Sequence, residues 1–294
     1  MKGRVTVPAI RAMKSRQRIG MLTAYDYPSA KISDAAGADI LLVGDSLGMV
    51  VLGYPDTLSV TVEDILHHTR AVVRGTQRAL VVADMPYLSY HVSIEESVRN
   101  AGRFIQAGAH AVKVEGGKAS RIKTISAMLD AEIPVMGHIG LTPQSVNAFG
   151  GFKLQGKEAD DARRLIDEAL ALEQAGCFSL VLECVPAELA AFITERLTIP
   201  TIGIGAGVKC DGQVLVYHDV LGLYDGHTPK FVRKYAQAAA ELQEALTHFL
   251  GDVREGSFPN DAESFHGTSE EELKRLYGQP EESGAIVVEM PKAQ

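Results

Sequence analysis

Residues 79–84 read Ala-Leu-Val-Val-Ala-Asp, an unbroken apolar run followed at once by a carboxylate. The segments 110–115 (His-Ala-Val-Lys-Val-Glu) and 178–183 (Phe-Ser-Leu-Val-Leu-Glu) are also largely apolar and also end in an acid. Near-continuous apolarity over so short a run is typical of a parallel strand buried on both faces. These segments therefore predict parallel strands that each end in an acidic side chain.

Similar short runs recur along the chain. The other predicted strands cover residues 19–23, 39–44, 133–138, 199–204 and 214–217. The segments between them have the apolar spacing of amphipathic helices. This alternation predicts an α/β fold, a (β/α)₈ TIM barrel. Only about ten residues separate the last two strands, which is too few for a crossover helix.

Residues with capping chemistry predict where the helices begin and end. Thr61 with Asp64, and Ser93 with Glu96, have the spacing of capping boxes. Glycine tolerates the left-handed conformation that ends many helices, and it is expected to do so at Gly37, Gly75, Gly108 and Gly176.

The domain prediction is one barrel with additions at both ends. Residues 1–17 are expected to form an extra N-terminal helix, and the Ala- and Leu-rich segment 229–250 the closing helix of the barrel. Residues 1–260 then form a single catalytic domain. Residues 261–294 are polar and predict a C-terminal tail with a short helix.

The composition excludes several classes of protein. With 46% hydrophobic and 22% charged residues, the chain has the profile of a soluble globular protein. Its net charge of −8 and the lack of a basic run argue against a nucleic-acid partner. Its three cysteines form no CxxC pair, the start has no signal-peptide core, and the uncharged stretch 133–152 is broken by prolines and glycines. We expect a cytoplasmic protein with no membrane contact.

Acidic side chains follow four of the predicted strands. They are Asp45, Asp84, Glu115 and Glu183, with Ser46 beside the first, and His138 ends a fifth strand. The carboxyl ends of barrel strands meet on one face, where active sites are built. Carboxylates gathered there repel one another and lose solvation, so they need a compensating cation. Oxygen ligands without clustered Cys or His favour Mg²⁺ over Zn²⁺.

Several of these features also have purely structural interpretations. A single Asp or Ser after a strand often caps a helix, and Lys113 could be an interior lysine paired with an acid. Four acids on alternating elements favour a functional site. The run Gly203-Ile-Gly205-Ala-Gly207 departs from GxGxxG, so a tight turn is favoured over a phosphate loop. His67 and His68 lie on a predicted helix, where packing or solvation is the simpler role.

Seven motifs, in order along residues 23–265, closely resemble the ketopantoate hydroxymethyltransferase family. They are Gly44-Asp-Ser-Leu-Gly-Met49, Ala83-Asp84-Met-Pro86, Lys113-Val-Glu-Gly-Gly117, Gly137-His-Ile-Gly-Leu-Thr-Pro-Gln144, Phe149-Gly-Gly151, Leu182-Glu-Cys-Val-Pro186 and Gly203-Ile-Gly-Ala-Gly207. The tail after His266 has no counterpart in the resemblance.

The resemblance implies both an activity and the residues that perform it. The expected reaction moves a one-carbon unit from 5,10-methylenetetrahydrofolate to 3-methyl-2-oxobutanoate, giving 2-dehydropantoate in pantothenate biosynthesis. One Mg²⁺ per subunit would be held by Asp45, Asp84 and Glu115. Substrate would be bound by Asp45, Ser46, Asp84 and Lys113, with Glu183 as proton acceptor. The family is typically a cytoplasmic decamer, so a homo-oligomer is expected.

The residue chemistry agrees with those roles. A 2-oxo acid can chelate Mg²⁺, which polarises the keto group and stabilises the enolate formed when the C3 proton leaves. Glu183 is placed to take that proton, while Lys113 and Ser46 can bind the substrate carboxylate. His138 could contact substrate or orient a ligand.

Two other functions fit the same pattern. The first is another Mg²⁺-dependent, enolate-forming barrel of the phosphoenolpyruvate mutase and isocitrate lyase type. The chain has no KKCGH-like loop, which the C–C-cleaving lyases of that type use. The second is a non-catalytic metal-binding scaffold, which would need neither Glu183 nor Lys113.

Overall fold

A closed barrel of parallel strands is the centre of the computed structural model, which describes residues 3–224, 226 and 228–277. Each strand pairs with the next in sequence order, and the eighth pairs with the first. The strands are β1 (Ile19–Thr23), β2 (Ile40–Val43), β3 (Leu80–Asp84), β4 (Ala111–Glu115), β5 (Val135–Gly140), β6 (Ser179–Glu183), β7 (Thr201–Ile204) and β8 (Gly212–Leu215). The predicted (β/α)₈ barrel is confirmed.

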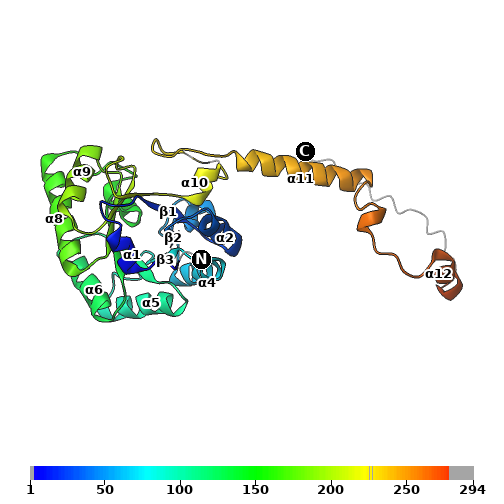
Figure 1. Ribbon diagram of the computed structural model, residues 1–294, viewed down its shortest axis with the longest axis horizontal. Coiled ribbons are helices and arrows are strands. Elements are labelled where there is room, and N and C mark those ends of the chain that lie inside the picture. The colour runs from blue at the N-terminus through cyan, green and yellow to red at the C-terminus, as the bar shows by residue number, and fades with distance from the viewer. Residues whose placement is uncertain (1–2, 225, 227, 278–294) are drawn as a thin grey trace. The chain divides into compact units, whose positions relative to one another are not determined.

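Helices surround this barrel (Figure 1). They are α1 (Val7–Ala12), α2 (Tyr27–Ala35), α3 (Leu47–Val50), α4 (Val62–Gly75), α5 (Ile94–Gln106), α6 (Ala119–Asp130), α7 (Val146–Phe149), α8 (Ala159–Ala175), α9 (Ala187–Arg196) and α10 (Tyr217–Leu221), with a 3₁₀ turn η1 (Pro143–Ser145). Thr61 caps α4 with both bonds of the predicted capping box. Ser93 caps α5 by accepting the backbone N–H of Glu96.

The strand side chains alternate between two hydrophobic cores. In β2, Ile40 and Leu42 fill the barrel interior, whereas Leu41 and Val43 pack outward under the helices. The interior core also includes Val5 and Ile10 of the N-terminal segment. The expected extra helix over residues 1–17 is therefore present but shorter, since it covers only α1.

The predicted helix-ending glycines have different roles. Gly37, Gly108 and Gly176 adopt φ values of +96°, +102° and +106°, as a left-handed helix end requires. The prediction for Gly75 is wrong because this residue lies within the last turn of α4. A Cβ on Gly75 would lie 2.5 Å from the carbonyl oxygen of Tyr27, so glycine here allows α4 to approach α2.

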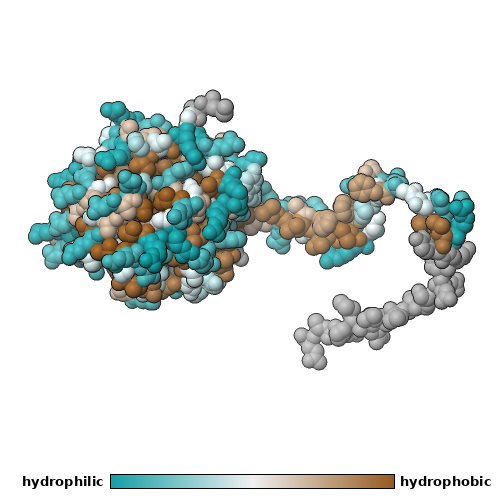
Figure 2. Space-filling model, turned by 90° about the horizontal axis from the view of Figure 1, so that it is seen from below, coloured by the Kyte–Doolittle hydropathy of each residue, from teal (hydrophilic) through white to brown (hydrophobic). Residues whose placement is uncertain are grey.

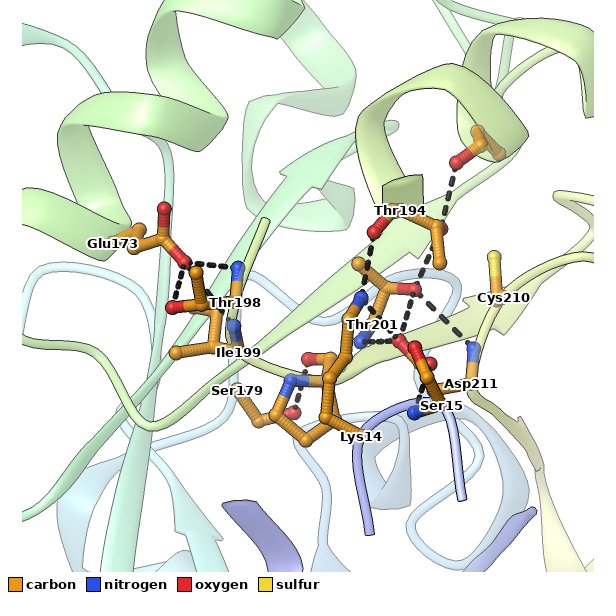
Figure 3. Close-up of polar contacts among 12 residues, drawn as sticks. Lys14, Ser15, Glu173, Ser179, Thr194, Thr198, Ile199, Thr201, Cys210 and Asp211 are labelled. Atoms are coloured by element: carbon orange, nitrogen blue, oxygen red, sulfur yellow. Dashed lines mark hydrogen bonds and ion pairs between the residues drawn. The ribbon is translucent and has the colours of Figure 1, made fainter. Parts of the chain in front are cut away.

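The eighth strand starts at Gly212, two residues before the predicted segment 214–217. Gly212 and Gln213 carry no apolar run, but both pair with β1. No helix joins β7 to β8, and Asp211 holds this connection instead. Its carboxylate accepts bonds from Lys14 Nζ (2.8 Å), Thr201 N (2.9 Å) and Ser15 N (3.1 Å), as Figure 3 shows.

We expect Asp211→Ala to lower the free energy of unfolding by about 3–5 kcal/mol, because it leaves the part-buried Lys14 ammonium without a carboxylate and with only the Thr194 carbonyl as acceptor. The midpoint of urea unfolding measures this change. Asp211 precedes β8 at the amino end of the barrel, so the kinetic constants of the folded variant should match those of the wild type. An unchanged midpoint would contradict the stabilising role.

The described chain divides into two units, and the second begins at residue 240. The sequence analysis predicted a closing helix over residues 229–250, and the predicted start is wrong. The helix in this region, α11, runs Ala238–Glu255. Residues 229–231 instead line a cavity, where the Phe231 ring packs over Gly205.

None of the α11 residues is buried within its own unit. Apolar side chains are exposed along it (Figure 2); they are Leu242, Leu246, Phe249, Leu250 and Val253.

The remaining described elements are η2 (Asp261–Glu263) and α12 (Glu270–Tyr277), and the expected short tail helix corresponds to α12. Residues 278–294 of the expected tail lie outside the described residues. Among the described helices, none has both the length and the apolar character needed to cross a membrane.

Candidate active site

A cavity of about 990 Å³ opens at the carboxyl ends of the barrel strands. It brings together every residue that the sequence analysis placed in the site, namely Asp45, Ser46, Asp84, Lys113, Glu115, His138 and Glu183. Strand alternation explains the grouping, because Lys113 and Glu115 are two residues apart on β4 and so face the same side. In the sheet register, Lys113 pairs with Asp84 and Glu115 with His138.

Lys113 and Asp84 form a buried ion pair. Lys113 Nζ lies 2.9 Å from Asp84 Oδ1, and the two side chains are 6% and 4% exposed. The other carboxylate oxygen of Asp84 accepts the backbone N–H of Asp45 at 3.0 Å. Burial works to lower the pKa of Lys113, but the charges of Asp84, Glu115 and Asp45 outweigh it and raise the pKa. Lys113 is therefore a charged interior lysine, available to an anionic ligand in the cavity.

His138 lies between the two glutamates of the site. Its Nε2 is 3.2 Å from Glu183 Oε2 and its Nδ1 is 3.5 Å from Glu115 Oε1. The Nε2 contact is not aligned as a hydrogen bond, so it is primarily a contact between charges. Burial and Lys113 act to lower the pKa of His138, but the two glutamates raise it to about 9. The His138 ring thus links the end of β4 to the end of β6.

Ser46 occupies the N-cap position of α3 but makes no capping bond with its side chain. Its hydroxyl is instead 2.9 Å from the hydroxyl of Tyr25, which follows β1. The simple capping interpretation therefore does not account for this side chain. Because Tyr25 is buried, the pair holds the Ser46 hydroxyl at the cavity wall.

The acidic side chains have the chemistry of a site for a hard cation. Burial raises the pKa of Asp45 well above its usual range, and the charges of Asp84 and Glu115 add to this effect. Glu115 Oε1 is buried without a hydrogen-bond partner. In the described part of the chain, no three His, Cys, Asp or Glu side chains are placed to hold a metal as they stand. The all-oxygen donor set, its excess negative charge and the unpartnered oxygen fit a divalent ion bound after side-chain adjustment.

The sequence analysis assigned no role to two buried polar side chains beneath these carboxylates. Gln144, in η1, contacts Asp45, Glu115 and the backbone of Met85. Tyr90 contacts Gln144 in turn. The only sequence signal for Gln144 was that it is the last residue of the motif Gly137–Gln144. An uncharged residue in a loop does not stand out as an acid after an apolar strand does.

The glycines after β7 form a turn in which two neighbouring side chains approach the backbone closely. Gly205 and Gly207 have φ values of +63° and +81°. A Cβ on Gly205 would lie 2.7 Å from the Phe231 ring, and one on Gly207 would lie 2.6 Å from Ala187 Cβ. This geometry supports the tight-turn interpretation. His68 is likewise packed, since its Nδ1 contacts the carbonyl oxygen of Tyr25.

The family profile described as ketopantoate hydroxymethyltransferase matches residues 4–261. The chain belongs to this family. A family relative from Clostridium botulinum (strain Alaska E43 / Type E3) is 57% identical over 274 residues, covering 92% of this chain and 99% of that protein. One from Nitratidesulfovibrio vulgaris (strain DP4) is 59% identical, covering 87% and 83%. Both are called 3-methyl-2-oxobutanoate hydroxymethyltransferase, so the ketopantoate hydroxymethyltransferase family is one of transferases.

Two solved structures of other enzymes have the same fold. Phosphonopyruvate hydrolase in complex with oxalate and Mg²⁺ has a TM-score of 0.58 and 17% identity, covering 92% of this chain and 94% of that one. A 2,3-dimethylmalate lyase of the phosphoenolpyruvate mutase/isocitrate lyase superfamily has a TM-score of 0.53 and 16% identity, covering 92% and 94%. At this identity the likeness shows the fold alone.

Proposed function

We propose that the chain transfers a hydroxymethyl group from 5,10-methylenetetrahydrofolate to 3-methyl-2-oxobutanoate, giving 2-dehydropantoate for pantothenate synthesis. The observation that carries this proposal is the single cavity in which the strand-end acids, Lys113 and His138 meet. Relatives that carry the name of this activity are similar to the chain over nearly its whole length. The cavity of about 990 Å³ is at the upper end of the range for drug-sized ligands, which supports a second, larger co-substrate beside a small 2-oxo acid.

Asp45, Asp84 and Glu115 are the residues that would hold one Mg²⁺ per subunit. When bound, this ion would polarise the keto group of the substrate and stabilise the enolate. Asp84 would both hold the ion and help to bind the substrate. Its ion pair with Lys113 supports this, because it places a cation directly beside the carboxylates. Lys113 would bind the substrate carboxylate by charge, and Ser46, held by Tyr25, would donate a hydrogen bond to it.

Glu183 would accept the C3 proton. Its side chain is 17% exposed and lines the cavity, so it is more accessible than the buried acids of the proposed metal site. His138 beside it, with Nε2 3.2 Å from Glu183 Oε2, would keep Glu183 oriented. A positioned base of this kind contributes about 10²–10⁴ in rate.

A steady-state assay with the oxo acid, the folate and Mg²⁺ tests the proposed activity. Product should form only when all three are present. An enzyme that instead cleaves a C–C bond in a 2-oxo acid or hydroxy acid without folate would have the activity of the phosphoenolpyruvate mutase/isocitrate lyase type. Binding of Mg²⁺ without any turnover would indicate a scaffold.

We also propose a cytoplasmic homo-oligomer, a decamer by family likeness, with residues 1–260 as the catalytic domain. Native mass spectrometry would measure the assembly. The polar residues 261–294 are proposed to take no part in the chemistry.

Truncation after residue 260 should therefore leave kcat and KM within a few-fold of the wild-type values, because every proposed site residue precedes it. Steady-state kinetics of the truncated chain, with circular dichroism as the folding control, measures this. A collapse of turnover in a folded truncation would show that the tail reaches an active site.

A further inference from the structure

A buried glutamine connects two of the carboxylates proposed to hold the metal. Gln144 is 7% exposed and lies just after β5. Its side-chain Nε2 donates to Asp45 Oδ2 at 2.8 Å and to the Met85 carbonyl at 3.0 Å. Its backbone N–H donates to Glu115 Oε2 at 3.2 Å. One residue thus holds one oxygen of each carboxylate.

The Tyr90 hydroxyl determines which way the Gln144 amide points. This hydroxyl accepts the backbone N–H of Glu115 at 3.3 Å, so its own proton is left for another acceptor. That acceptor is Gln144 Oε1, at 2.6 Å. With Oε1 facing Tyr90, the amide NH₂ must face Asp45. A flipped amide would place its oxygen against the carboxylate of Asp45 and the carbonyl of Met85.

Arg121, on α6, holds Tyr90 in place. The guanidinium lies 4.2 Å from the centroid of the Tyr90 ring, and its Nη1 donates to the Tyr90 carbonyl at 2.6 Å. Its Nε donates to the carbonyl of Glu115 at 3.0 Å. A buried chain of contacts therefore runs from the outer helix to Asp45 through Tyr90 and Gln144.

The contacts leave one oxygen of Glu115 for another ligand. Glu115 Oε2 is held by Gln144, while Oε1 is buried without a hydrogen bond and has only His138 Nδ1 beside it, at 3.5 Å. Metal-binding carboxylates commonly have one oxygen fixed by such an outer partner, and the loss of that partner weakens metal binding.

We propose that Gln144 is a positioning residue of the metal site, holding Asp45 and Glu115 in the orientation that binds the ion, and that Tyr90 fixes the Gln144 amide. This inference rests on the proposed role of Asp45 and Glu115 as metal ligands. Gln144 would not contact the reacting atoms.

Metal affinity tests the inference without any turnover. Mn²⁺ is titrated into metal-stripped protein and its free concentration followed by EPR, for the wild type, Gln144→Met and Tyr90→Phe. Methionine keeps the length of the side chain and the backbone N–H that holds Glu115, but it removes the side-chain donor to Asp45, so the Kd for Mn²⁺ should rise about 10–100-fold. Tyr90→Phe keeps the ring beside Arg121 and loses only the hydroxyl. The Kd of this variant for Mn²⁺ should also rise, but by less than that of Gln144→Met.

Tyr87→Phe is the matched control, because Tyr87 lies on the same loop and its hydroxyl makes no hydrogen bond within the described residues. Its Kd should equal that of the wild type. Wild-type affinity in both folded Gln144→Met and Tyr90→Phe would overturn the inference while leaving the metal site intact. Should Gln144→Met fail to fold, Tyr90→Phe decides alone. A wild type that binds no Mn²⁺ or Mg²⁺ would overturn the metal assignment and the inference together.

Discussion

Asp84→Asn should lose Mg²⁺ affinity and turnover together, with kcat/KM falling about 10²–10³-fold. Asp84 makes two buried contacts in the site, with Lys113 and with the backbone of Asp45. Asparagine keeps the shape but removes the charge that attracts the ion and pairs with Lys113. A bound metal supplies several kcal/mol of transition-state stabilisation, which corresponds to a rate effect of this size. Asp84→Ala should have the larger effect of the two, with the barrel still folded.

Removal of the ion from the wild type should reproduce the effect of the substitution. Enzyme dialysed against a chelator should be inactive and should recover with Mg²⁺ or Mn²⁺, whereas Asp84→Asn should recover poorly at any concentration. Asp130→Asn is a suitable control, since Asp130 is exposed at the end of α6. Full turnover by chelator-treated enzyme would rule out the metal requirement.

The sequence predicted the strands well because the buried parallel strand has a strong signal. Residues 19–23 match β1, and the acids at Asp84, Glu115 and Glu183 are the last residues of β3, β4 and β6. There are two exceptions: β5 covers Val135–Gly140, so it starts and ends two residues later than predicted and His138 is not its last residue, and β8 begins with Gly212 and Gln213. Backbone pairing with β1 determines where β8 starts, and such pairing cannot be recognised from the residue types.

The misplaced helix boundaries have physical causes in tertiary contacts. The apolar residues after residue 229 have helical spacing. Phe231 nevertheless packs over Gly205, so this segment forms part of the cavity wall instead of a helix. Gly75 is required by contact with Tyr27, a residue far away in the sequence. Local propensity cannot report such contacts.

The charged residues of the site could be predicted, but the residues that hold them could not. A strand-end acid is visible in the sequence as a charge after an apolar run. Gln144, Tyr90 and Tyr25 are neutral side chains in loops, and their contacts join residues from 21 to 99 positions apart. Their roles follow only from hydrogen bonds within the folded barrel.

Glu183→Gln should slow the exchange of the substrate C3 hydrogen by about 10²–10⁴, the contribution expected of a general base. Proton removal should not need the folate, so this step can be observed by itself. Enzyme, Mg²⁺ and 3-methyl-2-oxobutanoate in D₂O should lose the C3–H signal in the NMR spectrum. Glutamine keeps the shape beside His138 but cannot accept the proton.

Substrate affinity separates this role from that of the metal ligands. Glu183→Gln should leave the Kd of the oxo acid nearly unchanged, because Lys113 and the proposed metal ligands bind the other end of the molecule. Asp84→Asn should weaken binding and exchange together. Glu188→Gln, an exposed neighbour on α9, should exchange like the wild type. If Glu183→Gln also exchanges at the wild-type rate, the base lies elsewhere. His138, whose Nε2 lies 3.2 Å from Glu183, would be the next candidate.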